Sequence, residues 1–292
     1  MGLLSGFEHC VRQAEPLAPH TWFRLGGPAE YFAEPESVDE LAALVRRLYE
    51  NEISTRLLGG GSNVLVRDEG VPGMVIRLSA PAFAGTSVQG RKITAGGGVK
   101  LGQLISTSVR EGLAGLEALV GIPGTLGGAL HGNAGSRAGD IGQWTCRATV
   151  MTRTGEILER GRDDLTFAYR ESSLDELVIL SAQFELDQED AEELTKRMQK
   201  HWIVKKANQP LGHQSAGCIF KNPRGMSAGM LIDQAGLTGT RVGGAEVSDV
   251  HANFIVTNDS ASSQDVLRLI DLVRSRVSQR LGVDLETEIE VW

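Results

Sequence analysis

The chain has 292 residues, of which 41% are hydrophobic and 23% charged, and its formal net charge is -8. This composition is ordinary for a folded protein of two or three domains, so it excludes a wholly disordered chain. The acidic balance argues against a general nucleic-acid binder, and without an apolar run of membrane-spanning length no membrane segment is predicted. Glycine is in excess, and 21 of the 36 glycines fall within residues 59–142, where the backbone must turn tightly or approach something closely.

The first segment has the pattern of a small α/β unit. Ser37 and Glu40 form a capping box, and the apolar residues that follow at helical spacing predict a helix. These apolar residues are Leu41, Leu44, Val45 and Leu48. Short β-prone runs then predict strands at 55–58, 64–66 and 74–76.

The second segment, from about residue 73 to 186, alternates short strands with glycine turns. One helical face predicts a helix that ends at Gly112. The face consists of Leu101, Leu104, Ile105 and Val109. Further strands are predicted at 148–152 and 177–186. A polar helix from 189 to about 202 is the candidate connection between domains.

The last segment contains one long amphipathic helix. Its apolar stripe begins at Val266, Ser262 or Ser263 is the expected cap, and Gly282 is the expected end. A final strand is predicted at 285–291, where alternation would place Glu286, Glu288 and Glu290 on one face. The mixture of helices and strands predicts α+β or α/β layers.

Two glycine-rich runs are candidate binding loops. Residues 59–64 follow a strand, and their amides suit an anionic phosphate, although Val64 breaks the dinucleotide fingerprint. In residues 121–135, Ile122, Leu126 and Leu130 recur at spacing four, which permits a glycine-lined helical turn whose other face approaches a flat ligand. The alternatives are a tight turn for the first run and a loop packed against another backbone for the second.

Three further patterns could carry chemistry. Arg170 lies among polar residues and could hold a carboxylate, although an isolated arginine is more often a surface ion pair. Cys218 follows a glycine turn and precedes Lys221, which raises the odds of a functional thiol, although a lone cysteine is more often a small buried side chain. Residues 225–229 match the GxSxG pattern of serine hydrolases, with Ser227 as nucleophile, but no strand is expected before it. His251 could complete such a triad, and a structural histidine is the preferred interpretation.

In this order, the runs resemble the UDP-N-acetylenolpyruvoylglucosamine reductase family over nearly the whole chain. The matching motifs are TWFRLGGPA (21–29), LGGGSNVLVRD (58–68), GIPGTLGGALHGNAG (121–135), YRESS (169–173), SAGCIFKNP (215–223), AGMLIDQAGLTG (228–239), HANFIV (251–256) and LETEI (285–289). Their common order and compatible spacing make the resemblance specific. Little sequence separates residue 173 from 208–210, which resembles the shorter form of the family.

The resemblance implies an α+β fold: a two-subdomain FAD-binding unit of the vanillyl-alcohol-oxidase type at 1–72 and 73–205, then an α+β substrate-binding domain at 206–292. It implies a flavoenzyme that reduces the enolpyruvyl group of UDP-N-acetylglucosamine enolpyruvate to UDP-N-acetylmuramate during peptidoglycan precursor synthesis. FAD would be bound without a covalent link, and NADPH would be the co-substrate. A serine hydrolase using Ser227 and a non-catalytic flavin-binding protein are the alternatives.

Partners and location follow as expectations. A UDP-sugar substrate is expected, with no nucleic acid, membrane or metal partner, and a monomer is favoured. Three widely spaced cysteines without a CxxC pair indicate a reducing, cytoplasmic compartment.

The resemblance also implies roles for single residues. Hydride would reach C3 of the enolpyruvyl group, Arg170 and a protonated Glu288 would stabilise the enolate, and Cys218 would protonate C2. The family more commonly has serine at the Cys218 position, and an ordinary thiol is a better acid than an alcohol. Substrate contacts are predicted for Tyr169, Lys206, Asn222, Gln234 and Asn253. Cofactor contacts are predicted for Gly59, Gly60, Gly61, Ser62, Asn63, Val64, Gly121, Ile122, Pro123, Gly124, Thr125, Gly127, Gly128, Asn133, Ala134 and Gly135.

Overall fold

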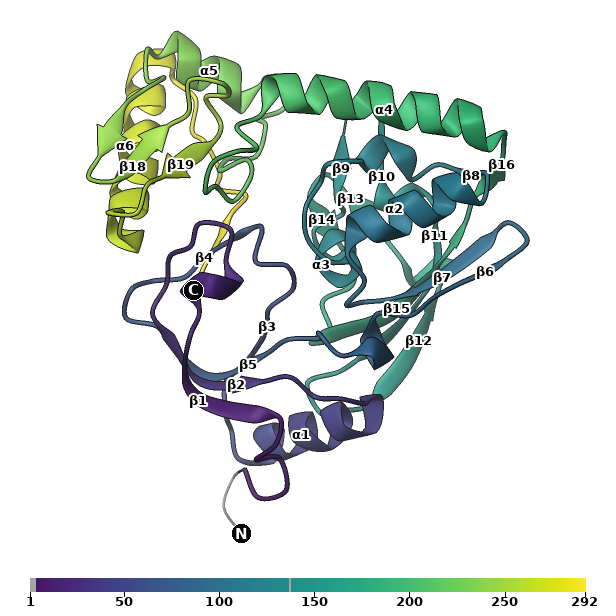
Figure 1. Cartoon of the computed structure of the whole chain (residues 1–292). Coiled ribbons are helices and arrows are strands. Elements are labelled where there is room, and N and C mark those ends of the chain that lie inside the picture. Colours follow the sequence, from purple (N-terminus) through teal and green to yellow (C-terminus); the bar gives the residue numbers. More distant parts are fainter. Residues whose placement is uncertain (1–3, 137) are drawn as a thin grey trace. The chain divides into compact units, whose positions relative to one another are not determined.

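The computed structural model describes residues 4–136 and 138–292, and its internal contacts divide the chain into two compact units. Unit 1 comprises the chain up to Ala14, Glu30–Gly60 and Pro72–Val204, and unit 2 comprises Glu15–Ala29, Gly61–Val71 and Lys205–Trp292 (Figure 1). Two early segments therefore group with the C-terminal residues. The three-part division at residues 72 and 205 stays a prediction. Among the described residues, no helix is both long enough and apolar enough to cross a membrane.

A four-stranded sheet, most of whose residues belong to unit 1, carries the first helix. Its strands are β1 (Val11–Pro16), β2 (Pro28–Ala33), β5 (Val71–Ile76) and β3 (Thr55–Leu57), in the order β1-β2-β5-β3. Helix α1 (Val38–Glu50) begins at Ser37, whose side chain accepts from the Glu40 N–H, as the capping box predicts. The Glu40 carboxylate accepts from the N–H of Glu36, one residue earlier than that pattern requires. The predicted apolar face of α1 is buried in the same core as Met74 and Ile76.

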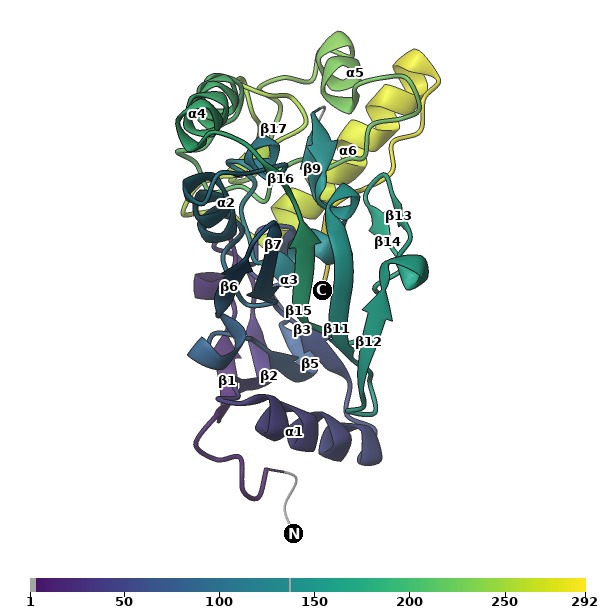
Figure 2. The same cartoon turned by 90° about the vertical axis from the view of Figure 1, so that its right-hand side faces the viewer.

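The second sheet of unit 1 is antiparallel and has five strands (Figure 2). They are β12 (Ile157–Gly161), β11 (Thr145–Met151), β15 (Val178–Glu185), β7 (Lys92–Gly96) and β6 (Thr86–Gln89), in that order. Helices α2 (Leu101–Arg110) and α3 (Leu126–His131) share a core with this sheet, where Leu104, Leu130 and Phe184 are buried. This packing fixes the position of the second glycine-rich run.

Short strand pairs join the loops of unit 1. They are β8 (Leu113–Ala114) with β16 (Asp187–Gln188), β9 (Gly135–Ser136) with β10 (Gly139–Asp140), and β13 (Phe167–Ala168) with β14 (Glu171–Ser172). Helix α4 (Ala191–Asn208) then runs across the boundary between the units, which falls between Val204 and Lys205. The helix extends beyond the predicted end at residue 202, because the residue that interrupts it, Pro210, comes later.

Unit 2 packs two helices against a small sheet. Its elements are α5 (Ala228–Gln234), β17 (Arg241–Val242), β18 (Ala245–Val247), β19 (Ile255–Thr257), α6 (Ser263–Leu281), and β20 (Glu290–Val291), which runs parallel to β4 (Val64–Leu65). Phe23, Leu25 and Leu65, which come from the two early segments, are buried in the same core as α5 and α6. The early segments are therefore part of the hydrophobic core of unit 2.

The ends of α6 are as predicted. Ser262 and Asp265 exchange side-chain and backbone hydrogen bonds of 3.1 Å, and Gly282 ends the helix at φ +68°. The Asp68 carboxylate, four residues after the first glycine-rich run, adds a second cap to α6, because it accepts from the Ser263 N–H at 3.1 Å.

The predicted final strand at 285–291 is wrong over most of its length. Only Glu290–Val291 form a strand, and Thr287 makes a single isolated bridge with Phe220. The partner strand β4 has two residues, so it cannot pair a longer strand. The expectation that three glutamates share one strand face fails with it: Glu286 is exposed and paired with Lys221, whereas Glu288 is half-buried.

Candidate functional site

The two glycine-rich runs contact each other within unit 1. A Cβ atom on Gly60 would lie 2.6 Å from the Cα of Gly124, and one on Gly59 would lie 2.8 Å from Oγ1 of Thr125. Real side chains do not approach this closely, so the contact requires glycine. The alternative predicted for the second run, close packing against another backbone, is therefore correct at Gly124.

The same runs present backbone donors. Within the part of the chain that the structure describes, no hydrogen bond involves the N–H of Gly59, Gly60, Gly121 or Gly124. All four residues are partly exposed. Gly121 and Gly124 have φ values of +77° and +113°, which orient their amides as ordinary residues rarely could. Amides without an internal acceptor can donate to an anionic group, so this part of unit 1 fits a ligand that carries phosphates.

Helix α3 organises the second run. It begins after Thr125, whose Oγ1 accepts from the Gly128 N–H at 3.5 Å. Leu126 and Leu130 are fully buried on one face, as the spacing predicts, whereas Ile122 precedes the helix. The predicted glycine-lined turn is confirmed as this short helix.

The remainder of the first run belongs to unit 2. The carbonyl of Gly61 accepts from the Trp22 N–H at 2.9 Å, and the Asn63 side chain donates to the carbonyl of Glu288 at 3.1 Å. Val64 pairs with Glu290 in β4 and β20. The run therefore connects directly to the residues around Glu288.

Arg170 lies in unit 1, in the turn between β13 and β14. Its φ is +59°, a left-handed conformation that is rare for residues other than glycine and is often found at functional sites. Its Nη1 donates to the carbonyl of Gly135 at 3.3 Å, and its guanidinium lies 5.3 Å from the ring centroid of Tyr169. Tyr169 is 52% exposed.

Cys218 lies in unit 2, on a segment that meets two other segments. It forms an isolated bridge with Phe254, and the carbonyl of the next residue, Ile219, accepts from the Glu288 N–H at 2.7 Å. Gly217, with φ +77°, turns the chain just before the thiol. The backbone thus places Cys218 and Glu288, both half-buried, on hydrogen-bonded neighbouring segments.

Asn253 fixes the Cys218 segment from the other side. Its side chain is buried and forms both possible hydrogen bonds with the backbone of Phe220, accepting at 3.0 Å and donating at 2.8 Å. The predicted substrate contact of Asn253 stays a prediction. In the structure, Asn253 bonds to the backbone of Phe220, two positions after Cys218, and so holds the segment that carries the thiol.

The other predicted substrate residues are in unit 2. Asn222 accepts from the Ala228 N–H at 2.9 Å, at the start of α5, and Gln234 is the exposed last residue of that helix. Lys206 is exposed near the end of α4. Lys221, the residue before Asn222, pairs with Glu286 at 2.7 Å.

The arrangement of Ser227 does not support the hydrolase alternative. Ser227 is the N-cap of α5 and accepts from the Met230 N–H at 3.4 Å. A turn precedes it, where a nucleophile elbow needs a strand. His251 accepts from the Asn253 N–H through Nδ1 at 3.2 Å, and burial lowers its pKa. His251 is therefore a hydrogen-bonded structural histidine, in agreement with the preferred interpretation.

One group of metal-ligand side chains lies elsewhere in unit 1. The ligand atoms of His9, Cys10 and Glu40 are within 4.8 Å of one another. His9 Nε2 lies 2.6 Å from Glu40 Oε1, and burial, followed by the charge of Glu40, raises the pKa of Cys10 to about 11. The raised pKa favours the protonated thiol, and a metal would need the thiolate.

The structure thus gathers the predicted residues in two sets. Unit 2 holds Cys218, Glu288 and the predicted contacts from Lys206 onward, and unit 1 holds Tyr169, Arg170 and the second glycine-rich run. Sequence alone missed the structural role of Asn133, whose buried amide bonds to Ala168 and Gly142. The residue type was the available signal, because asparagine adopts positive φ more readily than most residues, and Asn133 has a φ of +40°.

Two family models match the chain. Residues 29–161 match the FAD binding domain, and residues 209–292 match the C-terminal domain of UDP-N-acetylenolpyruvoylglucosamine reductase. UDP-N-acetylenolpyruvoylglucosamine reductase 2 of Symbiobacterium thermophilum is 43% identical, over 97% of this chain and 92% of that protein.

Solved structures agree. The UDP-N-acetylenolpyruvylglucosamine reductase of Thermus caldophilus is 38% identical, with a TM-score of 0.82 over 97% of this chain and 98% of that one. A variant of Phl p 4, described as a glucose oxidase, is 14% identical, with a TM-score of 0.50 over 65% of this chain and 44% of that one, and it shows the fold alone. These matches confirm the predicted α+β class, a vanillyl-alcohol-oxidase-type FAD-binding unit followed by a C-terminal domain.

Proposed function

Because the chain belongs to the UDP-N-acetylenolpyruvoylglucosamine reductase family, we propose that it reduces the enolpyruvyl group of UDP-N-acetylglucosamine enolpyruvate to UDP-N-acetylmuramate. This places it in peptidoglycan precursor synthesis. One observation carries the proposal: the 43% identity extends over 97% of the chain, and Arg170, Cys218 and Glu288 all lie within the motifs that resemble the family.

FAD is the cofactor, and the glycine-rich runs are the residues that would hold it. The unengaged amides of Gly59, Gly60, Gly121 and Gly124 would donate to its phosphates. When bound, FAD supplies the transfer of a hydride from NADPH to the substrate. The absence of side chains at Gly59 and Gly60 lets the two runs approach each other.

The remaining chemistry falls to side chains of the protein. The net reaction adds one hydride to C3 and one proton to C2 of the enolpyruvyl group, while NADPH becomes NADP⁺. Negative charge develops at C2 and its carboxylate, where the guanidinium of Arg170 and a protonated Glu288 would stabilise it. The Sγ–H of Cys218 would donate the proton to C2 and recover one from solvent.

Substrate contacts complete the proposal. Lys206 is an exposed cation suited to the diphosphate of a UDP-sugar, and Tyr169 offers an exposed ring and hydroxyl. Asn222 and Gln234 are assigned to remaining polar groups of the substrate, while the buried amide of Asn253 is engaged with the backbone of Phe220 and would act by holding the Cys218 segment.

The test separates the two half-reactions by stopped-flow absorbance of the flavin. Cys218→Ala should leave reduction by NADPH within about threefold of the parent. Reoxidation by the enolpyruvyl substrate should slow by about 10²–10⁴-fold, the usual contribution of a general acid. Arg170→Met should show the same selective loss.

Cys146→Ala is the matched control, because Cys146 is also half-buried but lies on β11, where its thiol donates to the carbonyl of Gln183 at 3.2 Å. It should leave both half-reactions unchanged. Normal reoxidation in Cys218→Ala would remove the proton-donor assignment. A parent protein that binds FAD but never oxidises NADPH with this substrate would be a non-catalytic flavin-binding protein.

A further inference from the structure

The β13–β14 hairpin, which carries Arg170 in its turn, is attached to the second glycine-rich run by several hydrogen bonds. Asn133 Nδ2 donates to the carbonyl of Ala168 at 2.7 Å, and Ser172 Oγ donates to the carbonyl of His131 at 2.9 Å. Arg170 itself donates to the carbonyl of Gly135 at 3.3 Å. Ala168, Arg170 and Ser172 each bond to a different residue between 131 and 135, so the turn is held at several points.

Asn133 is the buried member of this attachment. It is 3% exposed, and its φ is +40°, a region that asparagine tolerates better than most residues. Its Oδ1 accepts from the Gly142 N–H at 3.1 Å while its Nδ2 donates to Ala168. A backbone donor on one side and a backbone acceptor on the other leave only one orientation for the amide.

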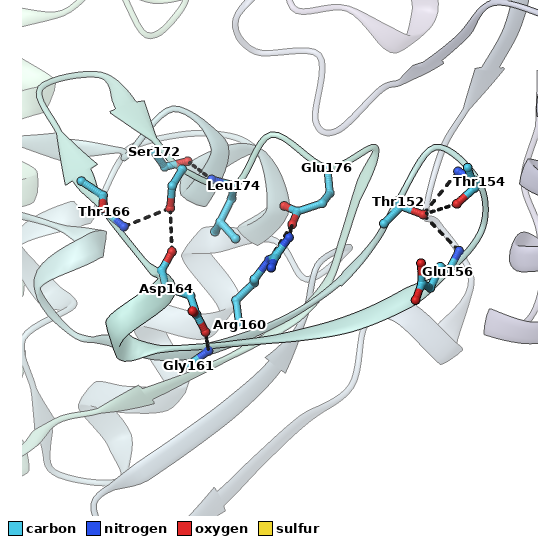
Figure 3. Close-up of polar contacts among 11 residues, drawn as sticks. Thr152, Thr154, Glu156, Arg160, Gly161, Asp164, Thr166, Ser172, Leu174 and Glu176 are labelled. Atoms are coloured by element: carbon cyan, nitrogen blue, oxygen red, sulfur yellow. Dashed lines mark hydrogen bonds and ion pairs between the residues drawn. The ribbon is translucent and has the colours of Figure 1, made fainter.

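The base of the hairpin is closed separately. The Thr166 N–H donates to Ser173 Oγ at 2.9 Å, and that hydroxyl donates to the carbonyl of Asp164 at 3.2 Å (Figure 3). Nearby, Arg160 and Glu176 form an ion pair at 2.6 Å. With the base fixed in this way, the freedom that remains is the position of the turn, and the contacts with residues 131–135 restrict it.

We propose that Asn133 is a positioning residue, which sets the position of the Arg170 guanidinium by holding Ala168. The inference rests on the proposed function, in which Arg170 stabilises the developing enolate. It gives the end of the second glycine-rich run a second role, because the segment proposed to meet the flavin also fixes the group that acts on the substrate. Asn133 therefore influences the reoxidation of the flavin by substrate through Arg170.

Two variants test the bond to Ala168, and only the first removes it alone. Asn133→Asp keeps an acceptor for the Gly142 N–H and tolerates positive φ, but it cannot donate to Ala168 when ionised. Asn133→Gly keeps the backbone conformation and removes both side-chain bonds, and it serves if the first variant folds poorly. Asn51→Asp is the matched control, because Asn51 also donates its side-chain N–H to a carbonyl, that of Arg47 at 2.8 Å, at the end of α1.

The first readout is structural and needs no substrate. Hydrogen exchange measured by mass spectrometry on peptides covering residues 165–174 should become at least tenfold faster in both Asn133 variants. Peptides from α1 and β15 should not change. Unchanged exchange in the hairpin would show that Asn133 does not hold it, which overturns the proposal whatever the activity.

The second readout is a double-mutant comparison at saturating FAD. Asn133→Asp should slow reoxidation by about 10- to 100-fold. Added to Arg170→Met, it should slow reoxidation by less than a further twofold, because its effect passes through the arginine. A full additional loss on the Arg170→Met background would overturn the positioning role. A parent enzyme that the substrate does not reoxidise would instead refute the proposed function and leave the hydrogen-exchange result standing.

Discussion

His251 accepts a hydrogen bond from Asn253, whose side chain holds Phe220, two positions after Cys218. The protonation state of the His251 ring therefore affects the segment that carries the thiol. Burial lowers its pKa, and its Nδ1 must be unprotonated to accept from the Asn253 N–H. In the unfolded chain the imidazole regains its ordinary pKa, near 6.5. As the pH falls below that value, the unfolded state binds a proton that the folded state resists, so the free energy of unfolding decreases.

We therefore expect the parent protein to lose stability between pH 7 and 5 faster than His251→Gln, in which an amide oxygen can replace Nδ1 as acceptor. The difference in slope should be at most about 1.4 kcal/mol per pH unit, the limit for one proton. Urea unfolding at a series of pH values measures it. Carboxylates titrate equally in both proteins, so identical slopes would show that His251 contributes nothing to the pH dependence.

At the residue scale, sequence motifs nominate Arg170, Cys218 and Glu288 as site residues, which stays a prediction, but they do not indicate the residues that hold them. Asn253 bonds to Phe220 and Asn133 to Ala168, each more than thirty positions away. Such partners follow from the tertiary fold, which a local pattern does not contain. A buried asparagine that clamps backbone looks, in sequence, the same as one that meets a ligand.

At the element scale, the contact between the two glycine-rich runs makes a sharp prediction. Gly60→Ala would place a Cβ 2.6 Å from the Cα of Gly124, so the runs would have to move apart. Overpacking of this kind costs about 1–3 kcal/mol. If the displaced amides bind FAD, affinity should fall by roughly 5- to 150-fold. Quenching of flavin fluorescence on binding measures it.

Gly85→Ala is the control for this variant. A Cβ there would meet nothing within 4 Å, and neither Gly60 nor Gly85 has a positive φ. We expect parental FAD affinity for Gly85→Ala. Equal affinities for both variants would mean that the contact between the runs does not shape the cofactor site.

Elements that carry their own end signals were predicted well. Helices α1 and α6 begin at the predicted serines, and α6 ends at the predicted glycine, because caps are local chemistry. The final strand was overextended because alternation of side chains shows which residues could form a strand but not how long the partner is. Pairing with the two residues of β4 decides the length of β20.

At the scale of the whole molecule, unit 2 is not a continuous piece of sequence. The C-terminal family model begins at residue 209, yet the core of this unit includes Phe23, Leu25 and Leu65, and β20 pairs with β4. A fragment of residues 205–292 should therefore show no cooperative urea transition by circular dichroism. Adding a fragment of residues 1–204 should restore one, because it contains the missing segments.

A 1–204 fragment with Phe23→Ala and Leu25→Ala should restore the transition less well, since truncating buried side chains costs about 2–5 kcal/mol each. A cooperative transition in the isolated 205–292 fragment would show that the early segments are dispensable. No periodicity in the sequence could reveal this division, because Leu65 and its core partners in α6 are about two hundred positions apart.

Because unit 2 is divided among three segments of the chain, the ribosome makes its parts at different times. Leu65 leaves the ribosome 140 residues before Lys205, the first residue of the last segment of its unit. At about 5–20 residues per second, this interval is roughly 7–28 seconds. During that time the apolar side chains of the early segments have no core to enter. The growing chain must keep them from aggregating until its final stretch is made, so translation speed and chaperone access bear directly on its yield.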